Sequence, residues 1–167
     1  MTTLLDEAIE AWEDARNGVI AELENIPANR FVVAPVPGTR GVGELALHIA
    51  EVGLMMVGEL TRDGGDFRRA PYEQLIAEYR APLDGVGGKR DIVAAMKRTL
   101  REGVRAFREA GELHLLGLVR RFDGKMGSRF AWMQHGIAHE EYHRGQIAMS
   151  ARMMGLKPAL TKLIEGG

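Results

Sequence analysis

Two histidines near the end of the chain stand four residues apart in a stretch with helical character. His139 and His143 lie within residues 128–155, SRFAWMQHGIAHEEYHRGQIAMSARMMG, which we predict to be one long helix. Side chains at positions i and i+4 of a helix lie on the same face, so two imidazoles at this spacing can reach a single ion. The spacing therefore predicts a metal site to which this helix supplies two ligands.

His135 precedes the pair by one further helical turn. His135 and His143 would lie about 12 Å apart along the helix axis, at a rise of ~1.5 Å per residue. Because imidazole nitrogens bind a zinc-like ion at about 2.1 Å, these two residues cannot share one ion. We interpret His135 as a packing or supporting residue, and a third ligand must come from another part of the fold.

That third ligand has to be a histidine or a carboxylate, because the chain contains no cysteine. His48 lies on the apolar stripe of a second predicted helix, close to Leu45, Ile49 and Val52. A lone histidine in such a stripe is commonly a core residue bonded to a carbonyl group. Helical bundles also build metal sites from side chains on facing helices, so both interpretations of His48 stay open at this point.

Four long segments are predicted to position these histidines. Apolar residues recur in them at steps of three and four, as expected of amphipathic helices. We predict long helices over residues 3–25, 41–61, 89–110 and 128–154, and a short extra helix over 71–79. The length of the chain and its 46% hydrophobic residues suit a single domain over residues 1–167. The predicted fold is all-α, an up-and-down four-helix bundle.

Two features of the connecting segments are also predicted. Thr39 is a natural N-cap for the helix that carries His48. Residues 115–122 have strand-like composition and precede an Asp123-Gly124 turn, which indicates a small β-hairpin. His114, beside this hairpin, is interpreted as a surface or packing residue.

Composition excludes several classes of partner. The 22 basic and 23 acidic residues give a net charge of −1, whereas a nucleic-acid-binding surface is normally strongly basic. The sequence has no apolar run near the ~18 residues that a membrane span requires. The N-terminal residues carry acids where a signal peptide carries bases. We expect a cytoplasmic protein that acts on a small-molecule substrate.

Two stretches carry a resemblance to a known family. GTRGVGELALHIAEVG around His48 and AHEEYHRGQI at 138–147 together resemble the DinB-like (YfiT-like) superfamily of metal-dependent enzymes. The resemblance implies an up-and-down four-helix bundle in which His48, His139 and His143 bind the metal. Members similar to this chain are often dimers. Relatives include S-transferases that use bacillithiol or mycothiol and a mycothiol-dependent maleylpyruvate isomerase.

The chemistry of such a site agrees with that implied activity. A divalent ion held by three neutral imidazoles keeps its full charge and acidifies a water or thiol bound to it. Since the chain has no cysteine, the thiol has to be a low-molecular-weight cosubstrate. The resemblance thus implies a metal-dependent enzyme, such as an S-transferase acting on small electrophiles, with zinc or nickel preferred over iron and copper, which three imidazoles also suit.

Two other functions are compatible with the same histidines. Residues 139–143 also match H-E-x-x-H, in which Glu140 would be the general base of a metal-dependent hydrolase. The metzincin extension is missing, because Gln146 and Met149 occupy its Gly and His positions. We accordingly expect Glu140 to be a helix-surface acid. The remaining alternative is a metal-binding stress protein without catalytic activity.

Residues after the second ligand are further candidates. Arg144 and Gln146 could orient a ligand or bind an anionic cosubstrate, and pairing on the surface or between helices is an equal alternative for them. Apolar residues that do not all fit inside a small bundle, Trp12, Met55 and Met154, together with the resemblance, predict a homodimer.

Overall fold

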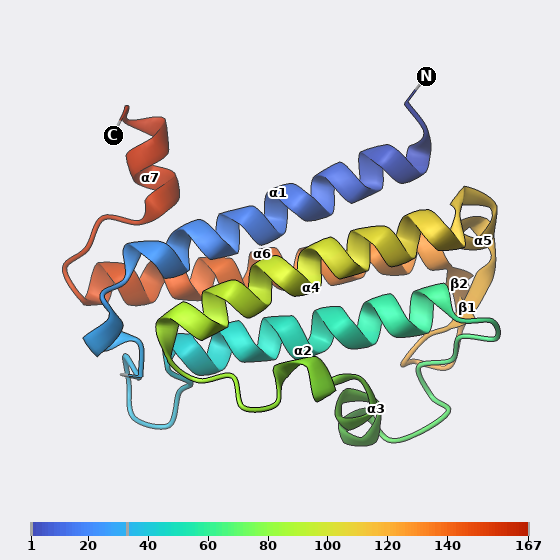
Figure 1. Ribbon diagram of the computed structural model, residues 1–167, viewed down its shortest axis with the longest axis horizontal. Helices are drawn as coiled ribbons and strands as arrows, with labels where there is room; N and C mark the ends of the chain where they lie inside the picture. The colour runs from blue at the N-terminus through green and yellow to red at the C-terminus, as the bar shows by residue number, and fades with distance from the viewer. Residues whose placement is uncertain (1, 33, 167) are drawn as a thin grey trace.

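Four long helices form a bundle in the computed structural model, which describes residues 2–32 and 34–166 (Figure 1). These helices are α1 (Leu4–Asn25), α2 (Val42–Thr61), α4 (Gly88–Ala110) and α6 (Arg129–Met153). Each end lies within one residue of the predicted boundary. The short extra helix is α3 (Tyr72–Tyr79). The predicted all-α four-helix bundle is confirmed.

The order of the helices around the bundle places α2 against α6. α1 packs on α4 and α6, and α2 packs on the same two helices from the opposite side. The long connection through α3 and the 3-10 turn η2 (Ala81–Leu83) returns the chain to the end at which α2 began, so α2 and α4 run in the same direction (Figure 1). α6 runs antiparallel to α2, and these two helices carry the three candidate ligands.

The beginning of α2 differs from the prediction. Gly41, not Thr39, is the N-cap residue, and the Glu44 carboxylate accepts the Gly41 amide hydrogen bond at 2.8 Å. Thr39 Oγ1 instead donates to the Val36 carbonyl at 2.7 Å. The threonine lies too far from the first turn of α2 and closes a turn in the preceding loop.

The hairpin is confirmed, but it is shorter than predicted. β1 (Leu118–Arg120) pairs antiparallel with β2 (Met126–Ser128), and Gly124 adopts a φ of 83° in the connecting turn. The first part of the predicted strand was wrong, because residues Glu112–Leu116 form the short helix α5, which buries Leu115. The 3-10 turn η1 (Ala28–Arg30) follows α1, and a further short helix, α7 (Ala159–Ile164), was not predicted.

The core contains two of the residues on which the homodimer prediction rested. Trp12 and Met55 are buried among the bundle helices, and Met154 is partly buried. Tryptophan and methionine at these positions fill the interior of a single bundle, so they were wrongly taken as exposed. The homodimer stays a prediction that now depends on the family resemblance. None of the helices in residues 2–32 and 34–166 combines the length and the apolar character needed to cross a membrane.

Candidate metal centre

Three histidines from α2 and α6 converge at the middle of the bundle. His139 Nε2 lies 3.3 Å from His48 Nε2 and 3.1 Å from His143 Nε2. The nearest ring nitrogens of all three residues lie within 4.8 Å of one another. Nitrogens around a tetrahedral ion with bonds of about 2.1 Å are about 3.4 Å apart. The predicted convergence of the three imidazoles is confirmed, and their spacing fits one shared ion.

Helix packing produces this geometry directly. His139 and His143 project from the same face of α6, with ring centroids 4.5 Å apart. His48 reaches them from α2, and its ring centroid lies 5.1 Å from that of His139 and 5.0 Å from that of His143. His143 is buried, whereas His48 and His139 are partly exposed. Among residues 2–32 and 34–166, the polar contact of the His48 ring is with His139 and not with a carbonyl group, which contradicts the interpretation of His48 as a carbonyl-bonded core residue.

The surroundings keep the imidazoles of His48 and His139 neutral. Burial, together with the charges of Arg40 and His143, lowers the pKa of His48 to about 4. Burial also lowers the pKa of His139 to about 3, with added contributions from His143 and His48. A metal ligand must offer the lone pair of a neutral imidazole. At neutral pH both residues are therefore in the form that binds a metal ion.

Gln146 orients one of the three rings. Its Oε1 lies 3.0 Å from His143 Nδ1. An amide oxygen only accepts hydrogen bonds, so Nδ1 carries the proton and the lone pair of Nε2 faces the other two histidines. The orienting role that the sequence offered for Gln146 agrees with this contact.

The Nδ1 atom of His139 is buried and has no hydrogen-bond partner among the described residues. A small cavity of about 20 Å³ is lined by His139, Glu140 and apolar side chains of α1, α2, α4 and α6. A volume of this size holds a single water molecule.

The other histidines lie outside the cluster, as predicted. The His135 ring stacks on Trp132, with centroids 4.4 Å apart and an interplanar angle of 12°. His114 Nε2 contacts the Leu60 carbonyl oxygen at 3.1 Å. Neither belongs to the group whose ring nitrogens converge. His135 is a packing residue at the edge of the site, and His114 is a packing residue of α5.

Glu140 is buried, so its prediction as a helix-surface acid was wrong. Its Oε1 accepts hydrogen bonds from Trp12 Nε1 and from the Arg16 guanidinium, both at 2.7 Å, and its Oε2 accepts one from Arg16 Nε at 2.7 Å. Consecutive helical residues point about 100° apart at 3.6 residues per turn, so Glu140 faces α1 while His139 faces α2. Because Arg16 and Trp12 engage both oxygens, Glu140 is not placed as the general base of an H-E-x-x-H hydrolase.

Arg144 lies on another side of α6. It pairs with Glu141 at 3.1 Å, and its guanidinium lies against Gly18 of α1, where even a Cβ atom would come within 2.3 Å of it. It lines a groove formed by α1, α6 and the start of α7. The contacts of Arg144 are those of surface and interhelix pairing.

An open pocket of about 460 Å³ adjoins the cluster at His143. It lies between the loop that precedes α2 and the C-terminal half of α6. The residues that line it are Pro35, Thr39, Arg40, Leu45, Tyr142, His143, Gln146, Met149, Ser150 and Met153. The sequence analysis missed Arg40, which carries the only permanent charge among these lining residues.

The sequence indicates a special role for Arg16 but not for Arg40. Arg16 stands four residues after Trp12 on the buried side of α1, and a charge buried there requires a partner. Arg40 precedes a helix in a loop, where a basic residue is ordinary and does not indicate a binding site. Trp132 of α6 packs near Phe67 and Phe122.

Comparisons with known proteins agree with this fold. A family model described as the DinB family matches residues 1–165. A DinB-like protein from Bacillus subtilis has a similar structure, with a TM-score of 0.67, 18% identity, and coverage of 89% of this chain and 92% of that chain. A DinB-family structure from Exiguobacterium sibiricum has a TM-score of 0.65 and 17% identity, with coverage of 93% and 95%.

A third similar structure is that of an enzyme. A mycothiol-dependent maleylpyruvate isomerase has a TM-score of 0.67 and 12% identity, with coverage of 87% of this chain and 61% of the isomerase chain. At these identities the likeness concerns the fold alone. No curated protein is significantly similar in sequence to the chain.

Proposed function

Because the chain belongs to the DinB family, we propose that His48, His139 and His143 hold a divalent metal ion, zinc or nickel, in a thiol-dependent transferase. The observation that carries the proposal is the convergence of three Nε2 atoms, at 3.1 and 3.3 Å for the two measured pairs, beside an open pocket. Structural zinc sites usually have four protein ligands, and catalytic sites have three. In the described residues the group comprises three histidines only.

A bound divalent ion would lower the pKa of a thiol that contacts it. The chain has no cysteine, so the thiol is a small cosubstrate that enters through the pocket. Its sulfur forms a bond to a carbon of the electrophile, and the leaving group departs with the electrons of the bond that breaks. The thiol proton passes to solvent. The fold shared with a mycothiol-dependent isomerase supports the choice of a thiol.

The protein's own residues would prepare this step in three ways. Burial keeps the His48 and His139 imidazoles neutral, which leaves their lone pairs free. Gln146 holds His143 in the tautomer that directs Nε2 at the other ligands. Tyr142, which also lines the pocket, packs edge-on against the His143 ring with 5.1 Å between centroids.

The test begins with the metal content of the purified protein and its His48→Ala and His114→Ala variants. The native protein and His114→Ala should bind one equivalent of zinc or nickel, whereas His48→Ala should not. The loaded protein is then assayed with 1-chloro-2,4-dinitrobenzene and a panel of small thiols, bacillithiol and mycothiol among them. Failure to bind metal would refute the site. Stoichiometric metal without thiol-dependent turnover would refute the transferase and leave the metal site standing.

A further inference from the structure

The pocket beside His143 has a lining of uneven chemistry. Apolar atoms come from Pro35, Leu45 and the thioether side chains of Met149 and Met153. Neutral polar groups come from Thr39, Gln146, Ser150 and the Tyr142 hydroxyl. The lining includes no aspartate or glutamate, and its one guanidinium is that of Arg40. A ligand that matches this lining has an apolar body and a negative charge.

Arg40 is available to pair with such a charge. It stands just before the N-cap of α2, and it takes part in no ion pair or hydrogen bond recorded within residues 2–32 and 34–166. Arg105, an exposed arginine of α4, instead pairs with the Glu109 carboxylate at 3.7 Å. The positive charge of Arg40 also reaches the metal centre, where it contributes to lowering the pKa values of His48 and His139.

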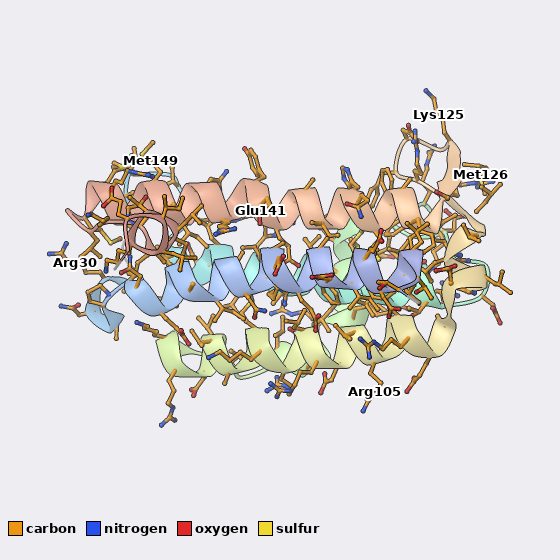
Figure 2. The ribbon with its side chains drawn as sticks, turned by 90° about the horizontal axis from the view of Figure 1, so that it is seen from above. Arg30, Arg105, Lys125, Met126, Glu141 and Met149 are labelled. Carbon is orange, nitrogen blue, oxygen red and sulfur yellow. The ribbon has the colours of Figure 1, made fainter. Side chains whose placement is uncertain are left out.

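The two methionines suit a small-molecule ligand. Met149 and Met153 stand one helical turn apart on α6 and are 56% and 55% exposed. Figure 2 shows Met149 at the end of the molecule where Arg30 lies, far from Lys125 and Met126 at the other end. Flexible thioether side chains adapt to ligands of different shape, and a pocket of about 460 Å³ is within the size range of small-molecule sites.

We infer that this pocket binds a small organic carboxylate, with Arg40 pairing with the carboxylate and Met149 and Met153 covering the apolar body. One part of the inference rests on the proposed function: the bound anion would be the electrophile or the thiol that reacts at the metal centre. Binding of the anion itself requires only the pocket, so it can be measured on metal-free protein.

A matched pair of dyes tests the pocket. 1-Anilinonaphthalene-8-sulfonate and N-phenyl-1-naphthylamine share an apolar body, and only the first carries an anionic group. An ion pair within a partly desolvated site is worth about tenfold in affinity or more. We expect the metal-free native protein to bind the anionic dye about tenfold more tightly than the neutral dye in fluorescence titrations. The Arg40→Gln variant should lose this preference and bind the neutral dye as the native protein does.

Arg105→Gln is the control, because Arg105 is an exposed arginine that extends from α4 on the side remote from α6 (Figure 2). It should keep the tenfold preference. Hexanoate should displace the anionic dye from the native protein, and hexanamide should not. The inference is overturned if the native protein shows no preference, if Arg40→Gln retains it, or if hexanamide competes as well as hexanoate.

The outcome is separate from that of the metal experiment. An Arg40-dependent preference in a protein that binds no zinc or nickel would leave the anion pocket standing and remove the proposed transferase. A protein that binds metal and turns over thiols, but has no Arg40-dependent preference, would retain the proposed function and lose the carboxylate assignment.

Discussion

His139 and Glu140 are neighbours in α6, yet they belong to two polar clusters of opposite character. Glu140 is buried in a cluster that is closed on itself, because Trp12 and Arg16 donate to both of its oxygens. Arg16 also donates to Thr99 Oγ1 at 3.2 Å. The three imidazoles at His139 have mainly one another as neighbours and adjoin an open pocket.

The contrast separates a structural role from a functional one. The polar atoms of a buried charge pair with complete hydrogen bonds are not free to bind a ligand. Breaking the pair lowers the stability of the fold. Three ring nitrogens that converge at this spacing can instead hold a cation. One helix therefore supports both clusters, since successive residues direct their side chains to different neighbouring helices.

The largest effect should come from opening the closed cluster. Glu140→Gln removes the negative charge and leaves the Arg16 guanidinium buried without an ionic partner. Breaking a buried pair in this way costs about 3–5 kcal/mol, so urea unfolding of metal-free protein at pH 7 should show a fall of this order. The folded fraction of the variant should still bind metal, because the three histidines are unchanged.

A double variant distinguishes lost pairing from general damage to the core. Replacing the pair by apolar residues of similar length, Arg16→Met with Glu140→Met, should recover most of the lost free energy of unfolding, since apolar replacement of buried ion pairs is often neutral or stabilising. If the double variant is as unstable as Glu140→Gln, the closed cluster is not held together in the way described.

The next effect concerns the open cluster. His139→Ala should lower zinc affinity by more than about 100-fold, beyond the 10- to 100-fold cost typical of losing an outer hydrogen-bond partner of a ligand. The free energy of unfolding of the metal-free variant should change far less than that of Glu140→Gln. Competition with a chelator of known affinity measures the zinc affinity, and urea unfolding measures the free energy of unfolding. A variant that retains native zinc affinity would remove His139 from the ligand set.

A smaller effect is expected from Gln146, which contacts His143 and is not one of the three converging residues. Gln146→Ala frees His143 Nδ1 from the acceptor that fixes its tautomer. Zinc affinity should fall by about 10- to 100-fold. Arg144→Gln is the matched control on the same helix, and it should leave zinc affinity at the native value because Arg144 pairs with Glu141. Equal losses in the two variants would contradict the orienting role.

The two clusters also differ in how far the sequence could reveal them. Apolar periodicity placed all four long helices, and the i, i+4 spacing placed His139 and His143 on one face. His48 needed the family resemblance, because a single histidine in an apolar stripe carries no information about which helix it faces. Glu140 was misplaced for the same reason, since its burial depends on where Arg16 of α1 packs, 124 residues away in the chain.

Short and irregular segments were the least predictable. α7 has six residues, too few for helical periodicity to appear, and it is held in part by a tertiary contact. The Glu22 carboxylate accepts the amide hydrogen bonds of Ala159 and Leu160 at 2.8 and 3.1 Å. Arg40 gains its significance only because the loop before α2 folds beside α6. Contacts between segments that are distant in the sequence therefore determine features, such as helix α7 and the position of Arg40 in the pocket, that local sequence patterns do not reveal.

The smallest effect should appear as a dependence of stability on pH that belongs to the open cluster. Burial lowers the folded-state pKa of His48 to about 4 and that of His139 to about 3, below the usual value of about 6.5. Between the folded-state pKa values and the usual value of about 6.5, the unfolded chain binds more protons than the folded one. The free energy of unfolding of the metal-free protein therefore rises with pH in this range. The contribution is complete above pH 6.5 and is lost as the pH falls toward 4 and 3.

Urea unfolding at pH 7.0 and pH 5.5 measures this contribution before most carboxylates titrate, since their ordinary pKa values are near 4. The native protein should be less stable at pH 5.5. The difference should be modest, because both rings are partly exposed to solvent. In the His48→Gln, His139→Gln double variant the difference should shrink, because glutamine does not titrate. An undiminished difference would show that the two imidazoles are not the groups that bind protons on unfolding, and the neutral, ligand-ready state assigned to them would be wrong.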